Sequence, residues 1–247
     1  AVYDSLHYDV EMIAGEKQLE YWERYLEETF RARGPETRSG SARAAYAALG
    51  VADWSNLPGT LEEVESIQRT IRDAETLTGK EVSEAVVKQM SDSGALADYR
   101  ILHFATHGLV VPVIPELSAI VLSQTEADSS GEDGYLRMGE ITELKLAADF
   151  VNLSACETGL GRVYGGEGVV GLTQAFLIAG ANGLSVSLWQ VADEATARFM
   201  EQLYKRVEQG MSYPEAMAAV KRSFINGEQG GEKTHPFFWA PFVYYGD

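Results

Sequence analysis

Short apolar runs and longer amphipathic stretches alternate over most of the chain. Apolar runs of this length are typical of buried strands, so we expect strands at YRILHFA (99–105), SAIVLS (118–123), DFVNLSA (149–155) and GLSVSLW (183–189). Apolar residues at helical spacing predict helices at 60–73, 83–93, 138–146, 168–179, 194–209 and 213–224. Strands that alternate with helices form βαβ units. The pattern therefore predicts an α/β fold with a mostly parallel central sheet sandwiched between helices.

Short sequence motifs indicate where two of these helices begin and how the chain ends. Thr60 and Glu63 have the spacing of a capping box at the start of the first helix, and Ser212 and Glu215 have it at the start of the last. The aromatic tail HPFFWAPFVYYGD (235–247) is interrupted by two prolines. We expect this tail to form a final strand docked on the core.

The first 55 residues give a weaker pattern than the rest. LHYDVEMI (6–13) alternates like a strand, and EKQLEYWERYLEETFRARG (16–34) has helical spacing up to a Gly-Pro pair. The polar stretch RGPETRSGS (33–41) is a possible junction. We therefore divide the chain into residues 1–55, which are the end of a preceding region or the first elements of the fold, and a main domain at 56–247.

Composition and charge narrow the possible partners. The chain has 20 Lys and Arg against 37 Asp and Glu, a formal net charge of −17. This charge repels phosphate, so we expect no direct nucleic-acid partner; it either favours basic peptides or simply maintains solubility. The single cysteine cannot form an internal disulfide, and no apolar run reaches the roughly 18 residues of a membrane span. We expect a cytoplasmic protein without membrane contact, and the missing initiator Met is compatible with a fragment of a longer chain.

The stretch HFATHG (103–108) contains two histidines with different expected roles. Four residues of strand span roughly 13 Å, so His103 and His107 cannot share a metal ion with bonds of about 2 Å, and we expect no metal site. His103 lies inside the apolar run, which favours a buried, hydrogen-bonded structural residue. His107 lies past the run, on a loop at the carboxyl end of the strand. Ligand sites of parallel sheets open at these ends, so His107 is a candidate general base.

The only thiol follows another predicted strand. Cys156 lies in FVNLSACETGLG, beside small residues and just after the apolar run. This position favours an accessible nucleophile over an inert buried cysteine. If the two strands are parallel neighbours, His107 and Cys156 face one cleft although they are 49 residues apart. A histidine beside a thiol accepts its proton and stabilises the thiolate.

Several long segments resemble the CHAT family, whose members are caspase-like and also similar to separase. The resemblance covers roughly residues 57–246 and rests on LPGTLEEVESI, LHFATHG, LSACETGLG, GEGVVGLTQAFLIAGANGLSVSLWQVADEAT and HPFFWAPFVYYG. It implies a caspase-like α/β fold and a cysteine endopeptidase of the clan CD type that needs no cofactor. His107 would be the base, Cys156 the nucleophile, and the backbone N–H groups of Gly108 and Cys156 the oxyanion hole. The motif SACETG nevertheless differs from the QAC motif of caspases.

The resemblance also implies where a substrate would bind. A protein or peptide substrate would lie extended beside the SVSLW strand, with Ser187, Trp189 and Asp193 as candidates for the S1 pocket. Many relatives have two acidic residues where this chain has Ala192 and Asp193. Asp193 either binds a basic P1 residue or only caps the following helix, in which case an apolar P1 residue is preferred. Trp189 is either a pocket wall or a core residue.

The resemblance also implies a regulatory partner, and two alternative functions remain. CHAT relatives are often fused to tetratricopeptide (TPR) repeats or controlled by partner proteins, which implies a TPR-containing or other regulatory partner here. A catalytically silent scaffold with the same fold is the first alternative, and the intact His–Cys pair argues against it. The second is dinucleotide binding at GEGVVG (166–171), although this motif lies about ten residues beyond its strand. The acidic stretch 125–134 predicts an exposed loop that acts as a gate or a linker.

Overall fold

The computed structural model describes residues 46, 54, 56–111, 115–124, 131–154, 167–189 and 191–246, with side chains between 167 and 189 described from residue 171 onward. The chain divides into two compact units, Ala1–Asp53 and Trp54–Asp247. The strand and helix predicted at 6–34 and most of the loop predicted at 125–134 lie outside the described residues. At the described end of that loop Asp133 and Gly134 are buried, so the prediction of an exposed loop is wrong there. All the helices and strands from α3 (Pro58–Thr70) onward belong to the second unit.

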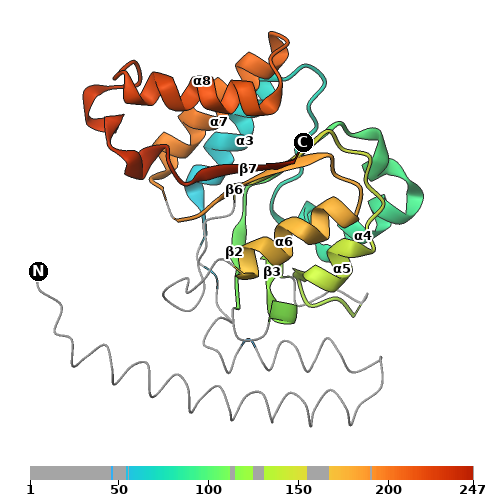
Figure 1. The fold of residues 1–247 in the computed structure, drawn as a ribbon. Coiled ribbons are helices and arrows are strands. Elements are labelled where there is room, and N and C mark those ends of the chain that lie inside the picture. The colour runs from blue at the N-terminus through green and yellow to red at the C-terminus, as the bar shows by residue number, and fades with distance from the viewer. Residues whose placement is uncertain are drawn as a thin grey trace, which may run out of the picture. The chain divides into compact units, whose positions relative to one another are not determined.

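A four-stranded sheet with the order β1-β5-β6-β7 forms the centre of this unit (Figure 1). Three strands run parallel, β1 (Ile101–Phe104), β5 (Phe150–Leu153) and β6 (Gly183–Ser187), and β7 (Phe242–Gly246) pairs antiparallel with β6. The prediction of a mostly parallel sheet is confirmed. The aromatic tail also forms the expected final strand.

A second, smaller sheet contains three antiparallel strands in the order β2-β3-β4. They are β2 (His107–Leu109), β3 (Ala119–Val121) and β4 (Tyr135–Arg137). The run SAIVLS therefore forms a strand as predicted, but it belongs to this sheet and not to the parallel one. The pattern did not predict β2 and β4, because HGL and YLR each mix polar and apolar residues, whereas the β3 sequence AIV is entirely apolar and lies within an apolar run.

All six predicted helices are present. They are α3 (Pro58–Thr70), α4 (Glu84–Ser93), α5 (Met138–Thr142), α6 (Glu167–Ile178), α7 (Asp193–Glu208) and α8 (Tyr213–Ile225). Helix α5 ends four residues earlier than predicted. The apolar residues that suggested a longer helix, Leu144 and Leu146, are buried in the segment that follows it. The Leu146 N–H donates to the Ala179 carbonyl at 2.9 Å, so tertiary contacts replace the helical bonds.

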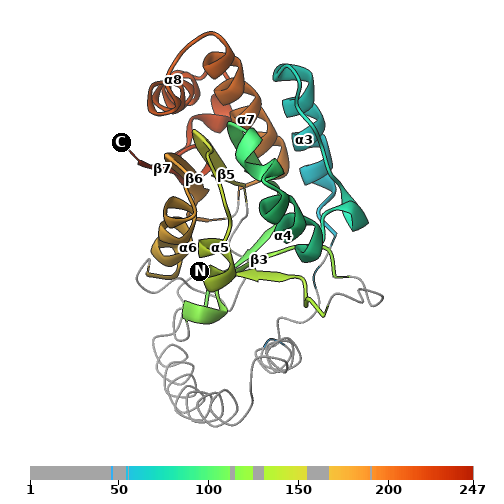
Figure 2. The same ribbon diagram turned by 90° about the vertical axis from the view of Figure 1, so that its right-hand side faces the viewer.

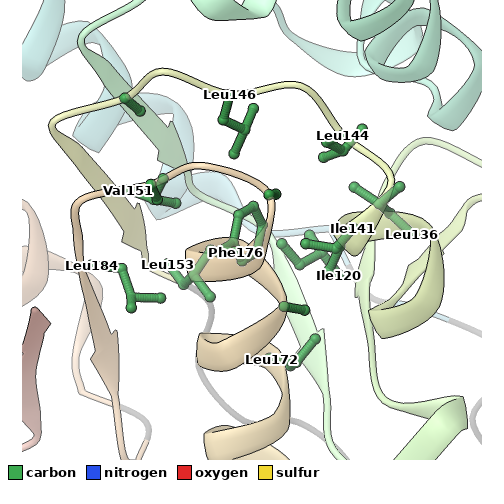
Figure 3. Close-up of a cluster of buried hydrophobic side chains, with 14 of the residues drawn as sticks. Ile120, Leu136, Ile141, Leu144, Leu146, Val151, Leu153, Leu172, Phe176 and Leu184 are labelled. Atoms are coloured by element: carbon green, nitrogen blue, oxygen red, sulfur yellow. The ribbon is translucent and has the colours of Figure 1, made fainter.

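Two apolar clusters attach the helices to opposite faces of the central sheet (Figure 2). Alternate residues of β5 supply both, because successive side chains of a strand point to opposite faces. Phe150 belongs to the cluster with α3, α7 and α8. Val151 and Leu153 belong to the cluster with α4, α5, α6 and the small sheet, where Phe176 lies at the centre (Figure 3). The sheet is therefore covered on both faces, as predicted.

The two expected capping boxes have different outcomes. Helix α3 begins at Pro58, two residues before the predicted cap, and the Thr60 hydroxyl donates to the Leu57 carbonyl at 2.7 Å. Pro is favoured at the first turn of a helix, because an N–H at that position would have no partner within the helix. The helix therefore begins at Pro58, and the Thr60–Glu63 box is wrong. The Ser212–Glu215 box at α8 is confirmed, with the Ser212 N–H 3.2 Å from Glu215 Oε2.

Within the described part of the chain, no helix combines the length and the apolar character that crossing a bilayer requires.

Candidate active site

The carboxyl ends of β1 and β5 lie side by side. The two strands pair in parallel with His103 opposite Asn152 and Phe104 opposite Leu153. The Ser154 N–H donates to the Phe104 carbonyl at 2.9 Å and continues the ladder to the end of both strands. The strands that precede His107 and Cys156 are therefore parallel neighbours, as a shared cleft requires.

His107 lies three residues beyond the end of β1. It was expected on a loop, and it is instead the first residue of the short strand β2, opposite Val121 of β3. The hydroxyl of the preceding Thr106 donates to the Val121 carbonyl and attaches this turn to β3. His107 is 8% exposed, and the Trp54 ring lies with its centroid 4.9 Å from the imidazole centroid at an interplanar angle of 41°.

Of the other two residues of the predicted dyad site, the structure describes Gly108 but not Cys156. Gly108 lies in β2, at the edge of the three-stranded sheet, opposite Ile120. Cys156 lies outside the described residues, which end at Ser154 on this side and resume at residue 167. The contact between His107 and Cys156 and the oxyanion hole at Gly108 and Cys156 therefore stay predictions.

From Leu184 to Val186, β6 pairs with β5 on one side and with β7 on the other, so no edge of this stretch is open to a peptide and the expected position of the substrate beside it is wrong. Two S1 candidates lie at the carboxyl end of β6. Ser187 is buried, and its hydroxyl donates to the Trp189 carbonyl at 2.7 Å. Trp189 is 36% exposed, and its Nε1–H donates to the Phe237 carbonyl at 3.1 Å. The core alternative for Trp189 is therefore wrong. Its role as a pocket wall and that of Ser187 stay predictions.

The third S1 candidate, Asp193, is the first residue of α7. The cap position belongs to Ala192, and no side chain caps the helix. The cap alternative for Asp193 is therefore wrong. An acidic residue in the first turn still interacts favourably with the positive end of the helix dipole. The Asp193 carboxylate is exposed and lies against Gly59 of α3, where an added Cβ would be 2.1 Å from its Oδ2. The pocket role of Asp193 stays a prediction.

His103 is a hydrogen-bonded internal residue, as predicted. Its Nε2 lies 3.1 Å from Glu63 Oε1, and its Nδ1 lies 2.9 Å from the Tyr204 hydroxyl and 3.1 Å from Asn152 Nδ2. Burial raises the pKa of Tyr204 well above its ordinary value, so this phenol keeps its proton and can donate it. The amide of Asn152 donates to the same nitrogen, which leaves Nε2–H to donate to the Glu63 carboxylate.

The His103 contacts continue as a polar row across the central sheet. Asn152 faces His103 on one side in the strand register and Ser185 on the other. The Ser185 hydroxyl donates to Asn152 Oδ1 at 2.8 Å, and both residues are fully buried. This row was not predicted from the sequence. An Asn and a Ser inside apolar runs are nevertheless a usable signal, because buried polar groups need partners.

A separate polar cluster joins α4 to the small sheet and α5. The Lys88 ammonium lies 2.7 Å from Glu84, 2.7 Å from Glu132 and 2.9 Å from Glu140. Carboxylate oxygens of these three residues lie within 4.8 Å of one another, a spacing that can suit a metal ion. Here the Lys88 ammonium contacts all three side chains and supplies one positive charge to the cluster. Burial raises the pKa of Glu84 to about 8, and its Oε2 also accepts the Gly134 N–H at 2.9 Å.

The third glycine of GEGVVG has a packing role. A Cβ at Gly171 in α6 would lie 2.8 Å from the sulfur of Met138 in α5, so the glycine allows these helices to approach closely. The first glycine of the motif lies outside the described residues. Dinucleotide binding was the weaker alternative, and close packing explains Gly171 without it.

The class of protein follows from the arrangement of the layers. A mostly parallel sheet between two helical layers is consistent with a caspase-like α/β fold. A family model for the CHAT domain matches residues 18–247, and the chain belongs to this caspase-like family. The match begins within residues 1–55, and the division at residue 55 stays a prediction.

Relatives of the chain are found among TPR proteins. It is 27% identical over 231 residues to tetratricopeptide repeat protein 28 of Mus musculus, a match that covers 78% of this chain and 9% of that protein. It is 25% identical over 227 residues to tetratricopeptide repeat protein 28 of Homo sapiens, covering 78% of this chain and 8% of that protein. The chain thus spans less than a tenth of the length of these relatives.

Proposed function

We propose that this CHAT domain is a cysteine endopeptidase in which His107 is the general base and Cys156 the nucleophile. The observation that carries the proposal is the parallel pairing of β1 with β5, because His107 and Cys156 each follow the end of one of these strands. Cys156 is two residues beyond Ser154, and two residues of chain reach at most about 7 Å. The proposal therefore requires no long excursion from this edge of the sheet.

The proposed reaction follows from the two side chains. His107 accepts the thiol proton, and the Cys156 sulfur attacks the scissile carbonyl carbon. The N–H groups of Gly108 and Cys156 stabilise the resulting oxyanion. The imidazolium then donates its proton to the departing amine as the C–N bond breaks. Water hydrolyses the thioester, with His107 as base, and regenerates the thiol.

Three features support a peptide with a basic P1 residue as substrate. Asp193 carries an exposed carboxylate that does not cap α7, so it can pair with Arg or Lys. Trp189 is exposed at the carboxyl end of β6 and fixed by its bond to Phe237. The net charge of −17 also favours basic peptides. Since the similar mammalian proteins are named for TPR repeats, we propose a TPR-containing region or partner as regulator.

Covalent labelling tests this proposal. The 247-residue chain is incubated with peptidyl acyloxymethyl ketones that differ only in P1, Arg or Leu, and intact mass is measured. We expect one adduct on the wild type, formed faster with Arg, and none on Cys156→Ala. Asp193→Asn should abolish the preference for Arg while the Leu probe still reacts. Absence of an adduct with and without added TPR protein would favour the silent scaffold and contradict the peptidase.

A further inference from the structure

The small sheet arranges three residues in one row beside the proposed base. His107 of β2 lies opposite Val121 of β3, and Val121 lies opposite Tyr135 of β4. Directly opposite residues of an antiparallel sheet place their side chains on the same face. The imidazole of His107 and the phenol of Tyr135 therefore belong to one face, separated by a single strand.

Trp54 connects the two ends of this row. Its Nε1–H donates to the Tyr135 hydroxyl at 3.0 Å, while its ring lies 4.9 Å from the imidazole of His107. The Trp54 and Tyr135 rings are 6.4 Å apart in an edge-to-face arrangement. Tyr135 is almost fully buried and cannot move far. Its hydroxyl thus fixes the indole ring, and the indole ring limits rotation of the imidazole.

We propose that Trp54 and Tyr135 are positioning residues for His107, an inference that rests on the proposed function. The base needs such support because β2 has only three residues and a histidine side chain has two rotatable bonds. Displacement of a catalytic group by about 1 Å can reduce the rate about 100-fold. An indole ring anchored at its far end holds the imidazole in one orientation without using either ring nitrogen as a donor or acceptor.

Four substitutions separate the parts of this device. Trp54→Ala removes both the ring contact and the anchor. Trp54→Phe keeps an aromatic face beside His107 but loses the N–H. Tyr135→Phe removes the accepting hydroxyl and keeps the buried ring. Trp239→Phe is the matched control, because the Nε1–H of Trp239 donates to the Thr234 carbonyl at 3.0 Å, in a segment after α8.

A first measurement requires no enzymatic activity. The ring Hε1 resonances of the four histidines are recorded by NMR, and His107→Asn identifies the one from His107. Aromatic rings shift the resonances of protons near their faces, so Trp54→Ala should move the His107 resonance. Tyr135→Phe should move it less, and Trp239→Phe should leave it unchanged. An unmoved His107 resonance in Trp54→Ala overturns the inference, whatever the activity of the protein.

A second measurement tests the catalytic consequence on the same variants. For the peptide with P1 Arg we expect kcat to fall about 10- to 100-fold in Trp54→Ala, with KM within about twofold, because orientation and not binding is lost. Trp54→Phe and Tyr135→Phe both keep an aromatic ring but lose the anchor, so each should have a kcat between those of the wild type and Trp54→Ala. If the resonance moves but kcat does not, the contact exists and positioning is refuted. If the wild type neither cleaves peptide nor accepts the ketone probe, the proposed function fails and the positioning role fails with it, while the NMR result still reports whether Trp54 contacts His107.

Discussion

Replacing Asn152 by Ala should destabilise the second unit more than the loss of three side-chain atoms suggests. Asn152 is fully buried and bonds His103 on one side and Ser185 on the other. His103 keeps its bond to Tyr204, so losing the amide costs about 1 kcal/mol there. The buried Ser185 hydroxyl loses its acceptor, which costs about 1–3 kcal/mol. With the cost of the cavity that the substitution leaves, we expect Asn152→Ala to lower the free energy of unfolding by about 3 kcal/mol in total.

A double-mutant cycle isolates the bond between Asn152 and Ser185. Ser185→Ala in the wild type should cost about 1 kcal/mol, whereas in the Asn152→Ala background it removes a hydroxyl that already lacks its acceptor and should cost nothing or stabilise. The expected coupling is therefore about 1–2 kcal/mol. Free energies of unfolding come from urea titration followed by tryptophan fluorescence; three of the four tryptophans, Trp54, Trp189 and Trp239, lie in the second unit.

A matched control and a refuting outcome complete the test. Asn182 is exposed on the segment before β6, so Asn182→Ala should change the free energy of unfolding by less than about 0.5 kcal/mol. If the effects of Asn152→Ala and Ser185→Ala add within about 0.5 kcal/mol, the two residues are not coupled. That result would refute the polar row across the sheet.

Two other predictions concern the remaining polar cluster and a turn. Burial raises the pKa of Glu84 from 4.5 to about 8, so its contribution to stability is present below about pH 4.5 and lost as pH rises through about 8. Urea titrations at a series of pH values should therefore show that the wild type loses more stability over this range than Glu84→Gln, and parallel curves would contradict it. Gly180 has φ +111°, and a Cβ there would lie 2.2 Å from the Leu146 carbonyl oxygen, whereas Gly210 has φ +93° and open space. Gly180→Ala should thus cost about 3 kcal/mol or more and Gly210→Ala about 1 kcal/mol in thermal unfolding; equal losses would show that the clash is relieved.

The sequence predicts best those helices and strands whose position depends on their own residues and not on contacts with distant parts of the chain. Helices α7 and α8 differ from their predicted bounds by one residue at most, because a long amphipathic period is a local property. The strands β1, β5 and β6 were visible as apolar runs between helices. The start of α3 was misplaced because Glu63 has the spacing of a cap but binds His103, a partner 40 residues away.

The candidate site shows the same division between local and tertiary information. His103 was correctly interpreted because a polar residue inside an apolar run must find a partner. The identity of that partner could not be predicted, since Tyr204 is 101 residues away on α7. Trp54 was missed because an isolated aromatic residue in VADWSNL has no periodic context. Its contacts with His107 and Tyr135 arise only when the small sheet forms.

The reactivity of the single thiol tests the central claim most directly. An ordinary cysteine has a pKa of about 8.5 and is less than about 1% thiolate at pH 6. Iodoacetamide alkylation of Cys156 is therefore followed by mass spectrometry at pH 6 in the wild type and in His107→Asn, with unfolding curves to verify the fold of the variant. We predict alkylation at least about 10-fold faster in the wild type, because His107 stabilises the thiolate. Equal rates in two folded proteins would contradict a His107–Cys156 dyad.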